Sequence, residues 1–323
     1  MNRFNSVKNI ATPAVCKNFR HVFAGLRARW KGQHNGLPGI EYDTFGRTLA
    51  LREIVRGRTL NPSIIFRLAN PVSCVRYFEY AYAGSVVKAQ LQRENRIGSV
   101  LDISSPRLFP LWMVEKAGLS VHMVNPDRSD LEGSRHMARF IKNNENLKFS
   151  DNVNATCLPF GENSFDLATS ISVIEHVPDD GDSMMISELK RVVRPDGRII
   201  LSFPVKPEFT NEYREINHYN RNQHSEKNGR FFFQRFYDSD SISKRILSHS
   251  GIVEEGRQYW SETPAGWFED YERKWMGEGL KQTVHDPELM SKHFIATGSN
   301  HPMDRMGICC ITLIVNKQDH RNL

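Results

Sequence analysis

The sequence between residues 97 and 205 alternates short apolar runs with amphipathic segments, and this alternation strongly restricts the fold. Strands are predicted at 99–104, 119–125, 147–153, 165–172 and 198–205, helices at 106–118, 129–144 and 181–193, and a last strand at 307–315. This order of elements predicts an α/β domain with a doubly wound, mostly parallel sheet that has helices on both faces. A ligand of such a sheet binds beyond the carboxyl ends of the strands.

Single residues mark the ends of these elements. Pro106 suits the first turn of a helix and Gly118 suits its C-terminal stop. Pro195 disfavours helix at the residue before it, so the helix that begins at 181 is expected to end there. Gly197 is expected to supply a positive φ in the turn that follows. Asp166 opens the fourth strand, where its carboxylate can accept backbone N–H groups.

The chain of 323 residues is predicted to contain three regions. Residues 1–40 form a basic amphipathic arm, 41–95 a helical extension, and 96–323 the α/β domain. Within that domain, 206–236 and 261–306 fit neither period and are predicted insertions that cap a substrate site. The arm has seven Lys or Arg residues and no acid, out of 43 basic and 37 acidic residues in all. Because the remaining chain is nearly neutral, no nucleic-acid-binding face is expected on the folded domain.

Within the arm, an apolar stripe at helical spacing predicts an amphipathic helix. Arg20, Arg27 and Arg29 lie off the stripe. Three interpretations are open: a helix packed on its own domain, a peripheral membrane contact through residues 17–31, and a cleaved organelle presequence. The residues of the stripe are Phe19, Val22, Phe23, Leu26 and Trp30.

The composition excludes several other classes of protein. No run approaches the roughly 18 apolar residues that a membrane span requires. The five cysteines are scattered without a CxxC pair, which is typical of a reducing compartment and predicts no metal site. We therefore expect a cytoplasmic protein, peripheral at a membrane if the arm binds one.

The stretch 154–204 is the most specific part of the sequence. It contains, in this order, LPF at 158–160, SFD at 164–166, EHV at 175–177 and RPDG at 194–197. With these motifs it resembles the class I S-adenosylmethionine-dependent methyltransferases, in the type 11-like subgroup that methylates small molecules and lipids. The resemblance implies a Rossmann-like sheet of the seven-stranded methyltransferase type. It also implies S-adenosyl-L-methionine as cofactor and a small-molecule, glycan or lipid acceptor.

The resemblance assigns cofactor-binding positions, and several of them are altered here. The family's first strand ends in D-x-G-x-G-x-G, where this chain has Asp102 and then Ser104, Pro106 and Leu108 in place of the glycines. The acid that holds the ribose corresponds to Asn125, with Asp127 two residues further, and the acid near the adenine corresponds to Asn154. The implied cofactor-binding residues are Asp102, Ser104, Ser105, Asn125, Asp127, Asn154, Ala155, Ser170 and Ser172.

A nicotinamide-linked dehydrogenase is the competing interpretation for this fold. It requires G-x-G-x-x-G after the first strand and an acid on the second strand. The sequence has neither, whereas it does have the methyltransferase-like stretch.

Methyl transfer depends largely on positioning, and an oxygen or nitrogen nucleophile can also require a base. The predicted catalytic residues are His218, which follows the fifth strand, and His176 in the EHV turn, for which a structural role is the alternative. Glu175, Tyr219 and His224 are further candidates. Aromatic residues that line an acceptor pocket, or alternatively form the core of the cap, are Phe231, Phe232, Phe233, Trp260, Trp267 and Trp275.

Two functions remain open at this point. The first is a methyltransferase that uses S-adenosylmethionine. The second is a catalytically inactive protein with the methyltransferase fold that serves as a binding partner or scaffold, and the altered cofactor positions motivate it.

Overall fold

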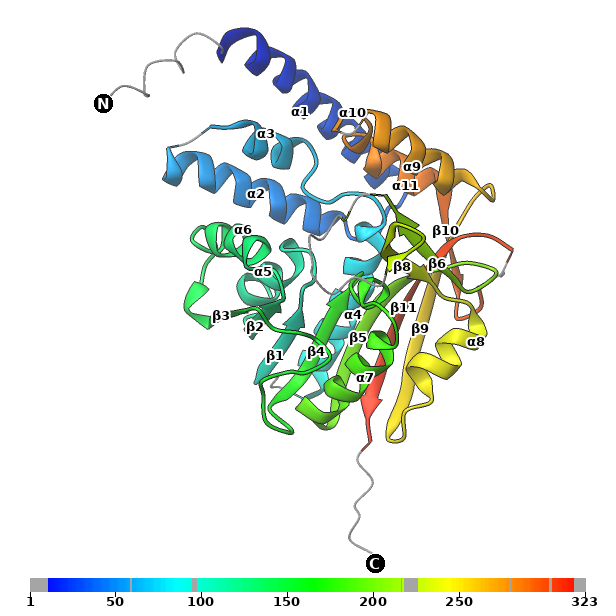
Figure 1. Ribbon diagram of the computed structural model, residues 1–323. Coiled ribbons are helices and arrows are strands. Elements are labelled where there is room, and N and C mark those ends of the chain that lie inside the picture. Colours follow the sequence, from blue (N-terminus) through cyan, green and yellow to red (C-terminus); the bar gives the residue numbers. More distant parts are fainter. Residues whose placement is uncertain are drawn as a thin grey trace, which may run out of the picture. The chain divides into compact units, whose positions relative to one another are not determined.

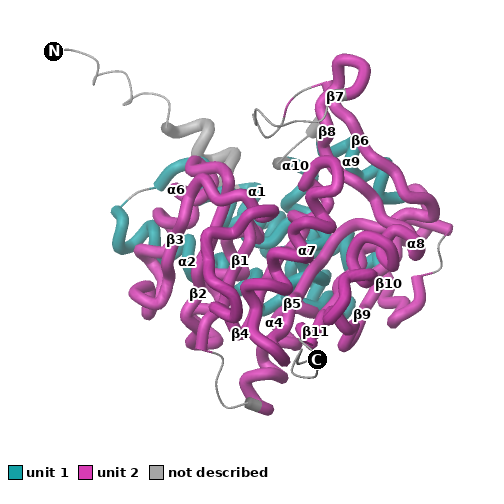
Figure 2. Tube along the Cα trace, turned by 60° about the horizontal axis from the view of Figure 1, so that its bottom comes forward, with its two compact units in different colours: residues 1–80, 267–294 teal, residues 81–266, 295–323 magenta. Residues whose placement is uncertain are grey.

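The computed structural model (Figure 1) describes residues 11–58, 60–94, 98–215, 217, 226–278, 280–301 and 304–316. The chain forms two compact units, one of residues 1–80 and 267–294 and the other of residues 81–266 and 295–323 (Figure 2). Most of the expected 261–306 insertion therefore belongs to the same unit as the N-terminal helices.

The second unit is built on an eight-stranded sheet with the order β10-β9-β11-β5-β4-β1-β2-β3. The strands β1 to β5 are parallel, and β11 is antiparallel to both β5 and β9. This is the predicted Rossmann-like sheet, with β10 added at its edge. The strands are β1 Ser99–Ile103, β2 Ser120–Asn125, β3 Leu147–Asp151, β4 Phe165–Ile171, β5 Val193–Val205, β9 Ile252–Glu262, β10 Phe294–Gly298 and β11 Gly307–Val315.

Helices lie on both faces of this sheet (Figure 1). Helix α7 packs through Met185, Ile186 and Leu189, all fully buried, against apolar side chains of β4 and β5. The helices are α4 Arg76–Glu94, which begins in the first unit, α5 Leu108–Glu115, α6 Arg128–Ala138, α7 Gly181–Val192 and α8 Ser239–Ile242. Short helical turns lie at η1 Asn144–Asn146, η2 Ile174–His176 and η3 Ser243–Leu247.

The structure confirms two of the predicted local roles and corrects two others. The carboxylate of Asp166 accepts hydrogen bonds from the N–H groups of residues 98 and 99, both at 2.7 Å, and α7 ends before Pro195 as expected. The positive φ of the following turn belongs to Asp196, at 61°, and not to Gly197. Gly197 is needed because a Cβ there would lie 2.8 Å from the carbonyl oxygen of Asp166. Pro106 precedes the first turn of α5 instead of lying within it.

The segment 206–236, which fits neither period, contains a separate three-stranded sheet with the order β6-β8-β7. Its strands are β6 Thr210–Arg214, β7 Glu226–Lys227 and β8 Arg230–Phe236. The sheet follows the carboxyl end of β5, and Tyr237 forms an isolated bridge with Val205. It therefore lies near the edge of the main sheet where a ligand is expected.

The first unit is helical, and a buried carboxylate joins its two chain segments. Asp286 accepts hydrogen bonds from the N–H of Cys74 and the hydroxyl of Tyr271, both at 2.7 Å. Burial raises the pKa of Asp286 to about 7, although these hydrogen bonds oppose the shift. The helices are α1 Ala11–His34, α2 Ile40–Gly57, α3 Pro62–Ala69, α9 Trp267–Glu278, α10 Leu280–Thr283 and α11 Asp286–His293.

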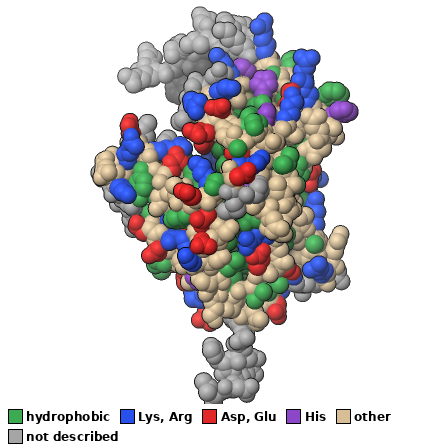
Figure 3. Space-filling view, turned by 90° about the vertical axis from the view of Figure 1, so that its right-hand side faces the viewer, with side chains coloured by type: hydrophobic (Ala, Val, Ile, Leu, Met, Phe, Trp, Pro, Cys, Tyr) green, Lys and Arg blue, Asp and Glu red, His purple; other side chains and the backbone are tan. Residues whose placement is uncertain are grey.

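The surface carries charges of both signs. On the face drawn in Figure 3, acidic and basic side chains are interspersed. None of the helices in the described part of the chain combines the length and the apolar character needed to cross a bilayer.

Candidate functional site

The candidate site lies at the carboxyl edge of the parallel strands. β1 ends at Ile103, β2 at Asn125 and β4 at Ile171, and the three strands are neighbours in the sheet. All nine predicted cofactor-binding residues are on these strands or in the loops that follow strands β1 to β4. The sheet therefore places side chains that are far apart in the sequence along one edge.

The side chain of Asp102 holds the loop after β1 in place. This side chain is fully buried, one oxygen accepts a hydrogen bond from the N–H of Ser105 at 3.2 Å, and the other accepts one from the hydroxyl of Thr169 at 2.7 Å. Burial raises the pKa of Asp102 to about 6, while these hydrogen bonds act in the opposite direction. The carboxylate thus ties the loop to β4.

The loop keeps a glycine-like backbone without glycine. Ser104 has φ 53°, in the left-handed region that glycine normally occupies, and its N–H and hydroxyl both donate to the carbonyl of Val124, at 2.9 and 3.2 Å. The hydroxyl of Ser105 accepts a hydrogen bond from the N–H of Ile171 at 3.1 Å. Pro106 has no N–H. Within the loop, therefore, the N–H groups and hydroxyls of both serines take part in internal hydrogen bonds.

The residues that follow β2 and β3 also form local hydrogen bonds. Asn125 is buried, and its side-chain oxygen accepts from the N–H of Asp127 at 2.7 Å. Asp127 is half-buried and caps α6 by accepting from the N–H of Ser129 at 2.7 Å. The side-chain oxygen of Asn154 accepts from the N–H of residue 156 at 3.0 Å, and Ala155 is buried.

Two serines lie at the end of β4. Ser170 is fully buried, and within the described part of the chain its hydroxyl has no hydrogen-bond partner. Ser172 has φ 48°, and its N–H donates to the carbonyl of Ser202 at 3.1 Å. Buried hydroxyls are nearly always paired with protein, water or a ligand. The half-buried carboxylate of Asp127 can accept hydrogen bonds from the hydroxyls of a nucleoside, whereas the N–H groups of Ser104 and Ser105 are already used within the loop after β1.

His176 lies in η2, directly after β4, beside strand β8. Its Nδ1 is 2.7 Å from the carbonyl oxygen of Phe233, and because a carbonyl only accepts, Nδ1 carries the proton. The other ring nitrogen, Nε2, is 3.7 Å from a carboxylate oxygen of Glu175. His218, Tyr219 and His224 lie outside the described residues.

A cleft opens on the three-stranded sheet that follows β5. Its volume is about 660 Å³, within the range of small-molecule sites. The cleft combines aromatic rings with two cationic side chains, and the ring of Tyr213 packs edge-on against Phe232. The lining residues are Phe209, Thr210, Asn211, Tyr213, Lys227, Asn228 and Arg230.

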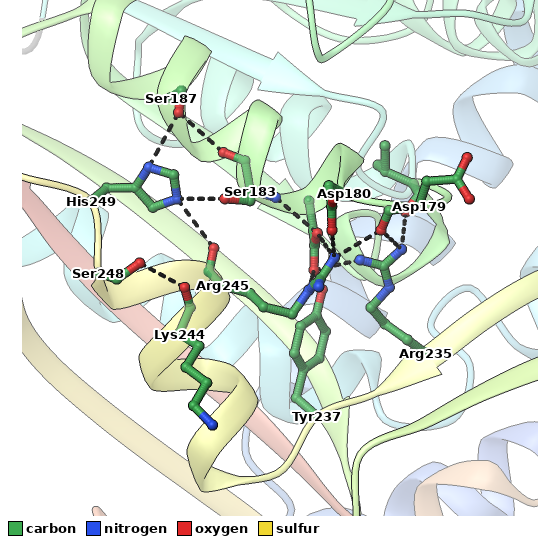
Figure 4. Close-up of polar contacts among 12 residues, drawn as sticks. Asp179, Asp180, Ser183, Ser187, Arg235, Tyr237, Lys244, Arg245, Ser248 and His249 are labelled. Atoms are coloured by element: carbon green, nitrogen blue, oxygen red, sulfur yellow. Dashed lines mark hydrogen bonds and ion pairs between the residues drawn. The ribbon is translucent and has the colours of Figure 1, made fainter.

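A buried ionic cluster connects this small sheet to helix α7 (Figure 4). Asp182 at the start of α7 is fully buried and forms ion pairs with Arg235 at 2.5 Å and Arg245 at 2.7 Å. The hydroxyl of Tyr237 also donates to Asp182, at 2.9 Å. The sequence analysis missed this cluster because Asp182 is more than 50 residues away in the sequence from Arg235, Tyr237 and Arg245 and shares no local motif with them.

The predicted aromatic pocket residues are not all brought together. Phe232 and Phe233 are on β8 and Trp260 is on β9, in the second unit. Trp267 and Trp275 belong to the first unit, where the Trp267 ring stacks on His293 with 4.3 Å between ring centroids.

Residues 109–201 match the family model described as a methyltransferase domain. Methyltransferase GfsG of Streptomyces halstedii is 33% identical over 91 residues, which are 28% of this chain and 32% of that protein, so the chain spans less than two thirds of this curated relative. The solved structure of MccD protein matches 73% of this chain and 98% of its own at 13% identity, with a TM-score of 0.47. A SAM-dependent methyltransferase from Methanosarcina mazei matches 72% of this chain and 98% of its own at 16% identity, with a TM-score of 0.45. Residues 109–201 are therefore similar to a methyltransferase domain, and they lie within the Rossmann-like sheet of the second unit.

Proposed function

We propose that this protein transfers a methyl group from S-adenosylmethionine to a small-molecule, glycan or lipid acceptor. One observation supports the proposal: the methyltransferase-domain match over residues 109–201 includes β2, β3 and β4, whose carboxyl edge carries six of the nine implied cofactor residues. When bound, the cofactor supplies an activated methyl group on its sulfonium. Asn125 and Asp127 would hold its ribose, Asn154 would lie by its adenine, and Ser104 and Ser172 would lie by its methionine.

His176 is the described residue best suited to take a proton from the acceptor. The hydrogen bond from its Nδ1–H to the Phe233 carbonyl fixes the ring orientation and leaves Nε2 as the basic nitrogen. The nearby carboxylate of Glu175 stabilises the imidazolium that forms when Nε2 binds a proton. Strand β8 thereby positions the base.

The cleft on the three-stranded sheet is the proposed acceptor site. Its aromatic side chains suit an apolar body, and Lys227 and Arg230 suit an anionic group on the acceptor. This choice predicts that replacing both cations with Gln raises KM for the acceptor more than it changes kcat.

Titration calorimetry with S-adenosylmethionine and S-adenosylhomocysteine tests cofactor binding directly. We expect the native protein to bind both ligands with micromolar affinity. If the side chain of Asn125 holds the ribose, Asn125→Ala should weaken this binding. If Asn125→Ala binds with unchanged affinity, the ribose contact is assigned to Asp127 instead. No binding at millimolar ligand would refute the enzyme proposal.

A second candidate function is a binding or scaffold protein with the methyltransferase fold and no cofactor. The specific observation in its favour is the use of the N–H groups of Ser104 and Ser105 in internal hydrogen bonds. The same calorimetry separates the two functions, since micromolar binding of the cofactor would refute this second candidate.

A further inference from the structure

Helix α1 packs on the first unit through its smallest residues. A Cβ on Gly25 would lie 2.0 Å from the carbonyl oxygen of Ala69, and one on Gly32 would lie 2.6 Å from the carbonyl oxygen of Pro287. Ala28, between them on the same helical face, is 1% exposed. The glycines therefore let the backbone of α1 lie directly against the ends of α3 and α11.

The large apolar residues of α1 point the other way. Phe23 is 71% exposed, Trp30 is 64% exposed and Leu26 is 44% exposed. At about 100° per residue, Phe23 and Trp30 lie nearly opposite to Gly25 and Gly32 on the helix. The helix therefore packs on its own unit, as one of the three interpretations expects, but it does so through its glycine face and not through these three residues.

The cationic side chains of α1 fall into two groups. Arg29 is paired with Asp43 at 2.9 Å, and Lys31 is paired with Glu288 at 2.9 Å. Arg20 and Arg27 are exposed and have no acidic partner among the described residues. On a helical projection both lie beside the apolar stripe, on the same side of it.

We propose that the outer face of α1 binds an anionic lipid surface, with Phe23, Leu26 and Trp30 entering the headgroup boundary. An exposed apolar face with a basic border is what a helix lying in a membrane interface presents, and Trp is favoured at that depth. Arg20 and Arg27 supply the charge complementarity to anionic headgroups. A second copy of the chain fits less well, because a symmetric contact through this face would bring the same arginines together. This membrane contact does not depend on methyl transfer.

Vesicle flotation of the full chain tests the proposal. The probes are phosphatidylcholine vesicles with and without about 30 mole per cent phosphatidylglycerol. We expect binding only to the anionic vesicles, loss of binding in F23S/W30S, and roughly 30-fold weaker binding in R20Q/R27Q. The matched control M184S/V253S removes two exposed apolar side chains of the second unit and should float like the native protein.

Tryptophan fluorescence provides a second measurement that does not depend on the folding of the double variant. In the native protein, anionic vesicles should shift the Trp30 emission to shorter wavelength, and W30F, which keeps a ring, should float while losing that part of the shift. The proposal is overturned if the native chain does not float with anionic vesicles, or if F23S/W30S floats as well as the control. It is also overturned if light scattering shows a dimer that F23S/W30S dissociates while vesicles bind neither protein.

Discussion

Replacing Asp182 with Ala should strongly destabilise the second unit. The carboxylate is fully buried and accepts hydrogen bonds from Arg245 at 2.7 and 2.8 Å and from Tyr237 at 2.9 Å, in addition to its ion pair with Arg235. The side chain of Arg235 is only 2% exposed. Burial by itself would raise the pKa of Asp182, but the hydrogen bonds from Arg245 and Arg235 outweigh it and hold the pKa below its ordinary value.

The size of the effect follows from what remains after the substitution. Removing one partner of a buried ion pair leaves an uncompensated buried charge, here on Arg235, and costs about 3–5 kcal/mol. For a unit of this size that corresponds to a fall in Tm of about 6–20 °C. Asp180→Ala is the matched control, since its side chain is 84% exposed and pairs with the same Arg245 at 3.1 Å, so its loss should cost less than about 1 kcal/mol.

Urea unfolding at pH 7, followed by circular dichroism, measures both variants. Because the folded pKa of Asp182 is lowered, its contribution is complete above the unfolded pKa and is lost as the pH falls through the folded pKa. The stability gap between the native protein and D182A should therefore narrow in acid. Equal costs for D182A and D180A at pH 7, or a gap that does not depend on pH, would refute the reasoning.

Two further changes test other buried groups. Asp286 has a pKa raised to about 7 by burial, so the folded state holds its proton more tightly than the unfolded state, and this group makes the stability fall as the pH rises from about 4 to about 7. D286N should remove this contribution and make the fall smaller than in the native protein, and an unchanged pH profile of unfolding would contradict it. Ser104 has φ 53°, so S104G should be more stable than S104A by about 1 kcal/mol, because Ala keeps the strain of the left-handed backbone without the hydroxyl. Thermal unfolding of the pair measures this difference, and an equally stable S104A would show that the position carries no strain.

The central strands of the main sheet were predictable because they are buried on both faces. A strand of this kind needs an apolar run whatever its neighbours are, so segments such as 165–171 and 307–315 appear directly in the sequence. The three-stranded sheet at 210–236 was not predicted, since its residues are mostly polar or aromatic and follow no period. Its position depends on the contact of Arg235 with Asp182, which no local pattern records.

The packing of α1 shows where periodicity misleads. The apolar stripe predicts a helix correctly, but it does not predict which face packs, because close approach of two backbones favours glycine over large side chains. The grouping of 267–294 with the N-terminal helices was equally hidden, since it depends on contacts between segments that are distant in the sequence, such as those of Asp286 with Cys74 and of Lys31 with Glu288.

The loop after β1 keeps the backbone conformation of a glycine motif without its residues. The glycines of the family's motif are absent, yet Ser104 keeps the left-handed backbone that glycine would adopt. This conformation costs a residue with a side chain about 1–2 kcal/mol. The two hydrogen bonds from Ser104 to the carbonyl of Val124 offset this cost. One of these bonds uses the N–H of Ser104, which is therefore not left to a ligand. Whether Ser104 and Ser105 form hydrogen bonds within the protein or with a ligand depends on how closely β2 and β4 approach the loop. The residue types alone do not specify this distance. Under the proposed function, replacing Asn125 or Asp127, whose side chains lie beyond this loop, should therefore weaken the binding of the cofactor.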